Sequence, residues 1–209
     1  MKGNVYTMEK IIWRANRVIS IETKRKDESR DENVYVLAQM INKAQLLVFN
    51  LFNTDNNWEN INLDESHVLF CTSVTRQFIK NSNIWTQKVQ PLTSYMASDI
   101  VIDIGMGRRR ITLWEGTPYE KSLLLSGRGG GRLVSRLGGE DKSKIPWIDP
   151  ADNETIDKYE LSNVRIYAEF NERLYLCYKL GRNVDPMKDL VFDRPIPLEY
   201  KEYVDIISS

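Results

Sequence analysis

The stretch that decides the fold reads VYVLAQM at residues 34–40 and LLVFNLF at residues 46–52. Both runs are short and apolar, with the β-branched and aromatic residues that strands favour. The polar triplet Asn42-Lys43-Ala44 separates them. Two short apolar runs joined by a short polar break are typical of a β-hairpin. The sequence therefore predicts that Val34–Met40 and Leu46–Phe52 pair antiparallel.

Further strand-like runs lie on both sides of this hairpin. Between them, Val74–Trp85 is the best helix candidate, because Val74, Phe78 and Ile79 alternate with polar residues at helical spacing. In the last third, Val164–Phe170 and Leu174–Leu180 flank a polar break and predict a second hairpin, and Leu198–Ile207 predicts a short helix or strand. The other predicted strands are Ile11–Ile21, His67–Thr72, Ile100–Ile104, Ile111–Trp114 and Leu123–Leu125.

Together these runs predict a mainly β protein of the α+β class. We expect an antiparallel, strongly twisted sheet or partly open barrel with one or two short helices. Residues 1–125 are predicted to form a β-rich domain, in which the charged run Thr23–Asn33 is a solvated loop or hairpin tip. Residues 126–150 are predicted to be a Gly/Arg/Pro loop, and loops of this length are usually functional or disordered. Residues 151–209 are predicted to be a C-terminal β-hairpin extension that packs on the same domain.

The charge of the chain is balanced overall but divided along its length. Lys plus Arg equals Asp plus Glu, 29 against 29, so no net charge draws the protein to nucleic acid or an anionic membrane. Residues 105–136 nevertheless hold seven basic and two acidic residues, and residues 137–209 hold ten basic and fifteen acidic residues. Such a division is typical of an interaction surface.

The two cysteines, Cys71 and Cys177, lie far apart in apolar stretches and are expected to be buried free thiols. A disulfide framework needs more cysteines and an export signal. The first residues lack the apolar segment of a signal peptide, and no window approaches ~18 uninterrupted apolar residues. These features predict a cytoplasmic protein without a membrane span.

Motifs for catalysis, metals and cofactors are weak in this sequence. His67 is the only histidine and is expected to have no catalytic role; with Cys71 it gives two ligands, too few for a zinc site. The glycine-rich runs at residues 105–110 and 127–132 place arginine where a dinucleotide-binding motif needs its third glycine. The sequence also lacks a phosphate-binding P-loop and a nucleophile elbow. We therefore expect no catalytic residues, no metal and no cofactor.

Arginines concentrate around the glycine-rich runs, and two interpretations of them remain open. They could grip phosphate groups or an acidic protein patch, or they could pair with the acidic C-terminal third in a mobile, solvated loop. Trp147 lies in an apolar cluster inside a polar loop, which must bury itself against something, and is a candidate interface anchor. The predicted partner-binding residues are Arg108, Arg109, Arg110, Arg128, Arg132 and Trp147.

Parts of the sequence resemble a known family, immunity protein 26 of bacterial polymorphic toxin systems. The likeness covers residues 3–52 and 67–92. It consists of Gly3-Asn4-Val5-Tyr6, the strand Trp13–Ile21, the paired strands of Val34–Phe52, the run His67-Val68-Leu69-Phe70 and the pair Ile84-Trp85. The resemblance implies a β-rich protein that neutralises a toxin encoded beside it, and it implies no catalytic residues. The chain from about residue 120 onward extends beyond the compact size of that family.

The sequence therefore predicts a non-catalytic binding protein, an immunity-type inhibitor that blocks a toxin or effector by direct protein contact. One alternative is a nucleic-acid or nucleotide-phosphate binding protein that uses the Arg/Gly-rich segment. Another is a hydrolase with an unfamiliar site.

Overall fold

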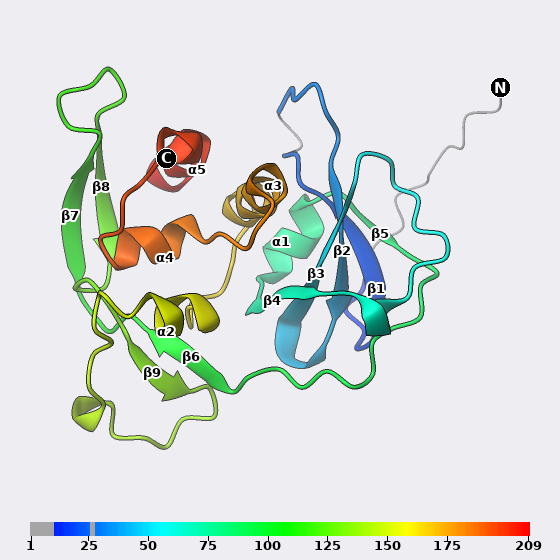
Figure 1. The fold of residues 1–209 in the computed structure, drawn as a ribbon, viewed down its shortest axis with the longest axis horizontal. Helices are drawn as coiled ribbons and strands as arrows, with labels where there is room; N and C mark the ends of the chain where they lie inside the picture. The colour runs from blue at the N-terminus through cyan, green and yellow to red at the C-terminus, as the bar shows by residue number, and fades with distance from the viewer. Residues whose placement is uncertain (1–10, 26–27) are drawn as a thin grey trace. The chain divides into compact units, whose positions relative to one another are not determined.

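The computed structural model of the chain describes residues 11–25 and 28–209, which divide into two compact units. Unit 1 comprises residues up to Tyr95 together with Val164–Asn183, and unit 2 comprises Met96–Asn163 together with Val184–Ser209. The boundaries differ from the predicted division at residues 125 and 150, because the chain leaves each unit and returns to it. Figure 1 shows the elements of both units.

Unit 1 is built on a five-stranded antiparallel sheet in the order β4-β3-β2-β1-β5. The predicted hairpin at its centre is confirmed, since Val36 pairs with Phe52 and Met40 with Leu46. The sheet is open, because β4 and β5 form its two edges. Its strands are β1 (Val18–Glu22), β2 (Tyr35–Met40), β3 (Gln45–Asn53), β4 (Val68–Ser73) and β5 (Ile84–Thr86).

Both faces of this sheet are covered, which explains the near-continuous apolar runs in the sequence. Successive side chains of a strand point to opposite faces, yet all five residues of β1 are buried. On one face Val18, Leu37 and Phe49 pack with Trp58 and Leu63, which come from the segment after β3. The central strands therefore lack the apolar and polar alternation of a half-exposed sheet.

Two helices of unit 1 pack beside β4 (Figure 1). They are α1 (Arg76–Asn81) and α3 (Glu169–Leu180). Thr75 caps α1 by accepting a hydrogen bond from Phe78 N. The fully buried ring of Phe170 on α3 makes edge contacts with Phe70 on β4 and Phe78 on α1. These aromatic contacts attach the helices to the sheet.

The second predicted hairpin is wrong, because α3 spans Glu169–Leu180. The residues interpreted as its turn, Asn171-Glu172-Arg173, are buried inside the helix. Asn171 Nδ2 donates to Glu22 O at 2.9 Å, and Asn171 Oδ1 accepts from Ser82 Oγ at 3.0 Å. Residues far from Asn171 in the chain thus satisfy the hydrogen-bonding groups of its side chain, although polar residues of this kind are typical of turns.

The charged run Thr23–Asn33 lies between β1 and β2, which pair antiparallel, so its prediction as a hairpin tip is confirmed, but it differs from the alternative of a solvated loop. Thr23 is buried, and Arg30 forms an ion pair with the buried carboxylate of Glu172 on α3. The Arg30 guanidinium also stacks on the Tyr175 ring at 3.5 Å. Part of the run is therefore held against α3 rather than released to solvent.

Other boundaries in unit 1 follow local backbone geometry. The first predicted strand begins at Val18 rather than Ile11, because Asn16 has a left-handed φ of 64° that interrupts extended backbone. The predicted helix ends at Asn81, and Ile84 and Trp85 belong to β5. Gly3–Tyr6, the first motif of the resemblance, lies outside the described residues.

Unit 2 contains two two-stranded antiparallel sheets and three short α-helices within its described residues. The sheets pair β6 (Ile100–Asp103) with β9 (Arg132–Ser135), and β7 (Arg108–Leu113) with β8 (Lys121–Ser126). Its core joins Ile102 of β6 to Ile156, Leu161, Val191 and Phe192. The helices are α2 (Asn153–Lys158), α4 (Pro186–Val191) and α5 (Lys201–Ser208).

Three predictions for this part of the chain need correction. Arg108–Arg110 lie in β7 rather than in a loop. The expected loop at 126–150 contains β9, which pairs with β6. The C-terminal extension is helical where a hairpin was expected. The fold class is confirmed, and α-helix is more frequent in the second half than the sequence indicated.

Both cysteines are free, as expected, but Cys71 is only half-buried where a buried thiol was predicted. Cys177 is buried, but it lies in α3 rather than in a strand. In the part of the chain that the structure describes, no helix combines the length and the apolar character that crossing a membrane requires.

Candidate functional site

The strands β7 and β8 form a ribbon whose two faces differ in exposure. Along β7, Arg108, Arg110 and Thr112 are exposed, and the residues between them are half-buried. Cross-strand partners share a face, and Arg108 lies opposite Ser126, while Arg110 lies opposite Leu124. We call this outward surface the ribbon face; it comprises Arg108, Arg110, Thr112, Ser122, Leu124 and Ser126.

The opposite side of the ribbon is anchored within unit 2. Arg109 Nη1 contacts Asp193 Oδ1 at 2.6 Å, and Arg109 Nη2 donates to Leu190 O at 2.7 Å and to Val191 O at 3.1 Å. These carbonyls end α4, where a cation complements the partial negative charge of the helix terminus. Arg109 is therefore a structural anchor.

Two further contacts anchor the end of the ribbon at which β7 ends and β8 begins. The Trp114 indole donates to Ile196 O at 2.9 Å, and Lys121 on β8 pairs with Asp205 on α5 at 3.0 Å. Asp205 also accepts from Lys201, and the hydrogen bonds from Lys201 and Lys121 hold the pKa of the Asp205 carboxyl below its usual value. The ribbon is thus supported along its length.

Arg108 and Arg110 make few polar contacts within unit 2. The described residues provide no hydrogen bond or ion pair for Arg108, and Arg110 makes a single 3.4 Å hydrogen bond to Ser122 on its own ribbon. Arg128, just beyond β8, is also exposed and without a described polar partner. Its side chain lies over Gly107, where a Cβ would approach Arg128 Cγ to 2.8 Å. Gly107 therefore leaves room for Arg128 beside the start of β7.

Arg132 and Trp147, the other two predicted binding residues, contact each other. Arg132 Nε lies 3.3 Å from Asp103 Oδ2, and the guanidinium lies 5.4 Å from the centre of the Trp147 ring. The Trp147 ring covers the backbone of Gly105 and Gly130, yet the residue remains 45% exposed. Arg132 is engaged internally, and Trp147 both packs on the turns and presents an apolar edge.

The structure thus divides the predicted arginines into two groups. Arg109 pairs with Asp193 in the acidic C-terminal third, as one interpretation expected, whereas Arg132 pairs with Asp103 on β6, outside that third. The exposed group comprises Arg108, Arg110 and Arg128. Sequence reasoning missed Leu124, which is 57% exposed, and Met106, which is 90% exposed. The run Leu123-Leu124-Leu125 carried the signal for Leu124, because the middle residue of three in a strand must face away from its neighbours.

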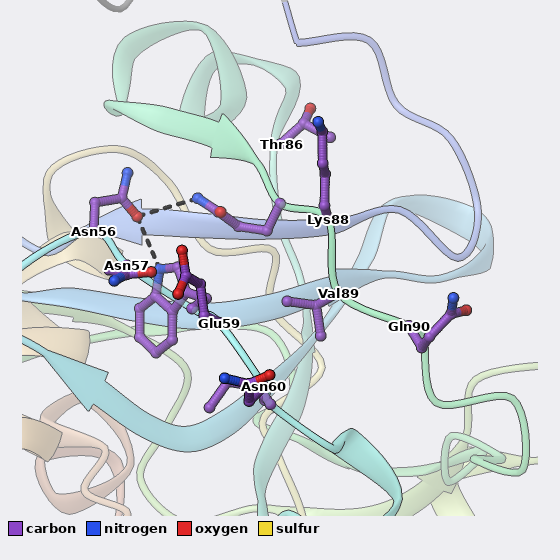
Figure 2. Close-up of a pocket in the computed structure, with 11 residues that line it drawn as sticks. Asn56, Asn57, Glu59, Asn60, Thr86, Lys88, Val89 and Gln90 are labelled. Carbon is purple, nitrogen blue, oxygen red and sulfur yellow. Dashed lines mark hydrogen bonds between the residues drawn. The ribbon is translucent and has the colours of Figure 1, made fainter. Parts of the chain in front are cut away.

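Unit 1 offers a second candidate, a polar cavity of about 620 Å³. It lies between residues 56–61, which follow β3, and residues 86–90, which begin at the end of β5. Figure 2 shows Asn57, Glu59 and Asn60 on one wall and Lys88, Val89 and Gln90 on the other. No sequence motif pointed to this cavity, because its walls come from two segments that meet only in the fold.

His67 and the side chains that could ligate a metal do not gather into one site in the described residues. His67 is exposed just before β4. Among residues 11–25 and 28–209, no group of three or more His, Cys, Asp and Glu side chains is placed to hold a metal ion. The ribbon face and the cavity do offer exposed charge, hydrogen-bonding groups and apolar contact, which are the means by which proteins bind ligands and partners.

Comparison with known proteins identifies one family for this chain. Neither the curated proteins nor the solved structures gave a significant match. Residues 8–102 and 141–195, well over half of the chain, match the model of a family described as "Domain of unknown function (DUF8309)". The match leaves out residues 103–140, which hold the whole ribbon face. The chain therefore belongs to the DUF8309 family.

Proposed function

We propose that this protein is a non-catalytic binding protein that neutralises a bacterial toxin or effector in the cytoplasm by covering its surface, as immunity proteins do. The observation that carries the proposal is the ribbon face. Arg108 and Arg110 stand exposed on a ribbon that Arg109, Trp114 and Lys121 anchor from behind.

A ribbon that is anchored from behind suits binding, because its backbone does not have to become ordered when a partner binds. Immobilising a flexible side chain or loop reduces affinity, and the backbone of this ribbon is already paired and anchored. Arginine and methionine are enriched in protein interfaces, and Arg108, Arg110, Arg128 and Met106 are all exposed in this region. The positive charge favours an acidic partner surface.

Two details favour a protein over a nucleic acid as the partner. Leu124 lies opposite Arg110 and brings an exposed apolar side chain into the basic face, where it suits a protein surface better than a row of phosphates. Glu115 and Glu120, both exposed in the turn between β7 and β8, would repel a phosphate backbone.

A nucleic acid is the second candidate, favoured by the shape of the ribbon. The major groove of DNA admits a two-stranded β-ribbon, and arginine is the commonest side chain that reads guanine there. A gel-shift titration of the protein with duplex DNA, repeated over increasing salt, tests this alternative. Tight, salt-dependent binding would replace the protein-partner proposal.

The resemblance to immunity protein 26 supports the proposed activity, whereas the matched family is described as a domain of unknown function and says nothing of activity. The resemblance to immunity protein 26 falls in residues of unit 1, and the matched family segments also cover most of that unit. The ribbon face falls in the unmatched segment 103–140. We infer that the ribbon determines which partner this chain recognises.

Co-expression with the product of the neighbouring gene tests the proposal. We expect the wild-type protein to restore growth to cells that express a toxic neighbour, and to co-purify with it at a constant ratio. The His67→Ala variant should protect equally well, because His67 is exposed and outside the ribbon face. Protection without a complex, or loss of protection in a folded His67→Ala variant, would contradict a non-catalytic mechanism.

A further inference from the structure

The cavity of unit 1 contains a side-chain amide whose orientation is determined by chemistry. Trp58 is buried in the core, and its indole Nε1 donates to Asn56 Oδ1 at 2.8 Å. An indole N–H can only donate, so the Asn56 atom that it meets must be the carbonyl oxygen. The amide nitrogen of Asn56 therefore points elsewhere.

The same reasoning determines the orientation of Gln87. Its Nε2 donates to Asn56 Oδ1 at 3.1 Å, a hydrogen bond that a dashed line from Asn56 marks in Figure 2. It also donates to Ser20 Oγ at 2.7 Å, and both hydrogens of the amide are then used. Gln87 Oε1 and Asn56 Nδ2 have no hydrogen-bond partner among the described residues. The cavity wall thus holds a carbonyl acceptor and an amide donor, both immobilised by hydrogen bonds and neither engaged.

We propose that this cavity is a binding site for a neutral, polyhydroxylated ligand, a saccharide. Every sugar hydroxyl both donates and accepts hydrogen bonds, and the walls offer both functions through carboxamides of residues 56, 57, 60, 87 and 90. Val89 and the half-buried Ile61 supply apolar wall for the C–H faces of a sugar ring. The volume of about 620 Å³ lies in the range of small-molecule sites.

The charges around the cavity favour a neutral ligand. Glu59 and Lys88 are its two charged residues, one of each sign, so neither an anion nor a cation gains a clear attraction. An apolar ligand would leave the carboxamides without partners, which is costly in a closed complex. A ligand with hydroxyl groups satisfies them.

The decisive variant is Asn56→Asp. An aspartate has the same shape and keeps the oxygen that accepts from Trp58 and Gln87, but it lacks the Nδ2 donor. The fold should therefore be retained while one hydrogen bond to the ligand is lost. Gln77→Glu is the control, because it adds the same charge at an exposed residue of α1 that does not line the cavity.

The measurement is a titration of the full-length protein by nuclear magnetic resonance with glucose, galactose, N-acetylglucosamine and maltose. Glucuronate and N-acetylglycinamide serve as the charged and peptide-like probes. We expect at least one neutral saccharide to shift signals of residues 56–61 and 86–90, with affinity about tenfold lower in Asn56→Asp and nearly unchanged in Gln77→Glu. Binding of N-acetylglycinamide or glucuronate alone, binding of no saccharide, or equal binding by wild type and Asn56→Asp would overturn the proposal.

Discussion

The sheet of unit 1 and the ribbon of unit 2 use the alternation of strand side chains in opposite ways. In β1 and β2 nearly every residue is buried, because both faces of the sheet are covered. In β7 every second residue is exposed, because one face of the ribbon is anchored and the other is free. Unit 1 therefore uses its strands for stability, while the ribbon keeps half of its side chains available to a partner.

The largest expected difference comes from removing one large apolar side chain from each region. Phe170→Ala should lower the free energy of unfolding of unit 1 by about 3–5 kcal/mol, because the ring is fully buried against Phe70 and Phe78. Leu124→Ala on the ribbon face should change stability by no more than about 0.5 kcal/mol. Urea unfolding of both variants measures the two losses of unfolding free energy. A similar loss for Phe170→Ala and Leu124→Ala would contradict the proposed difference between the sheet and the ribbon face.

The second prediction separates two adjacent arginines of β7. Arg109→Ala should cost about 1.5–3 kcal/mol of unfolding free energy, because Arg109 donates to two carbonyls at the end of α4 and contacts Asp193. Arg108→Ala should stay within about 0.5 kcal/mol, because Arg108 is exposed. Thermal and urea unfolding of the two variants measures these differences. Equal losses of unfolding free energy would show that Arg108 also has a structural role.

The smallest expected effect on stability concerns the contact between the ribbon and α5. Lys201 and Lys121 lower the folded-state pKa of Asp205, so this carboxylate stabilises the fold above its unfolded-state pKa, and the contribution is lost as pH falls through the folded-state pKa. Asp205→Asn should therefore cost a few tenths to about 1 kcal/mol at neutral pH and almost nothing in strong acid. A difference between variant and wild type that grows in acid would refute this assignment.

The central hairpin was predictable because its information is local. Val34–Met40 and Leu46–Phe52 carry their apolar runs and their turn within one short segment, which was enough to predict the antiparallel pairing but not the irregularity in its register between Val36 and Ala38. Helix α3 was missed although Phe170, Leu174 and Cys177 have helical spacing. Its polar residues resembled a turn, and they are buried only because β1 and the segment 23–33 supply partners from far along the chain.

The candidate sites could also be predicted only in part, because they depend on residues that lie far apart in the chain. The sequence indicated the basic segment, but it could not separate Arg109 and Arg132 from Arg108, because their carboxylate partners Asp193 and Asp103 are set by the fold. The cavity of unit 1 could not be predicted from the sequence, because it also depends on segments that only the fold brings together. Its walls are separated by more than one strand in the chain, and neither wall alone carries a motif.

The most direct test of the central claim is the association rate with the product of the neighbouring gene, measured over a salt series. The ribbon variant changes Arg108, Arg110 and Arg128 to Ser. The control variant removes three exposed positive charges of unit 1 by changing Arg76, Lys80 and Arg182 to Ser. Both variants lose the same charge, so only the position of the charge differs.

We expect the ribbon variant to associate about tenfold or more slowly than wild type at low salt, because the ribbon charge steers an acidic partner. The difference should shrink as salt screens the field, and the control variant should remain close to wild type. Equal association rates for wild type and the ribbon variant, or equal slowing in both variants, would contradict the claim that the ribbon face is the binding surface.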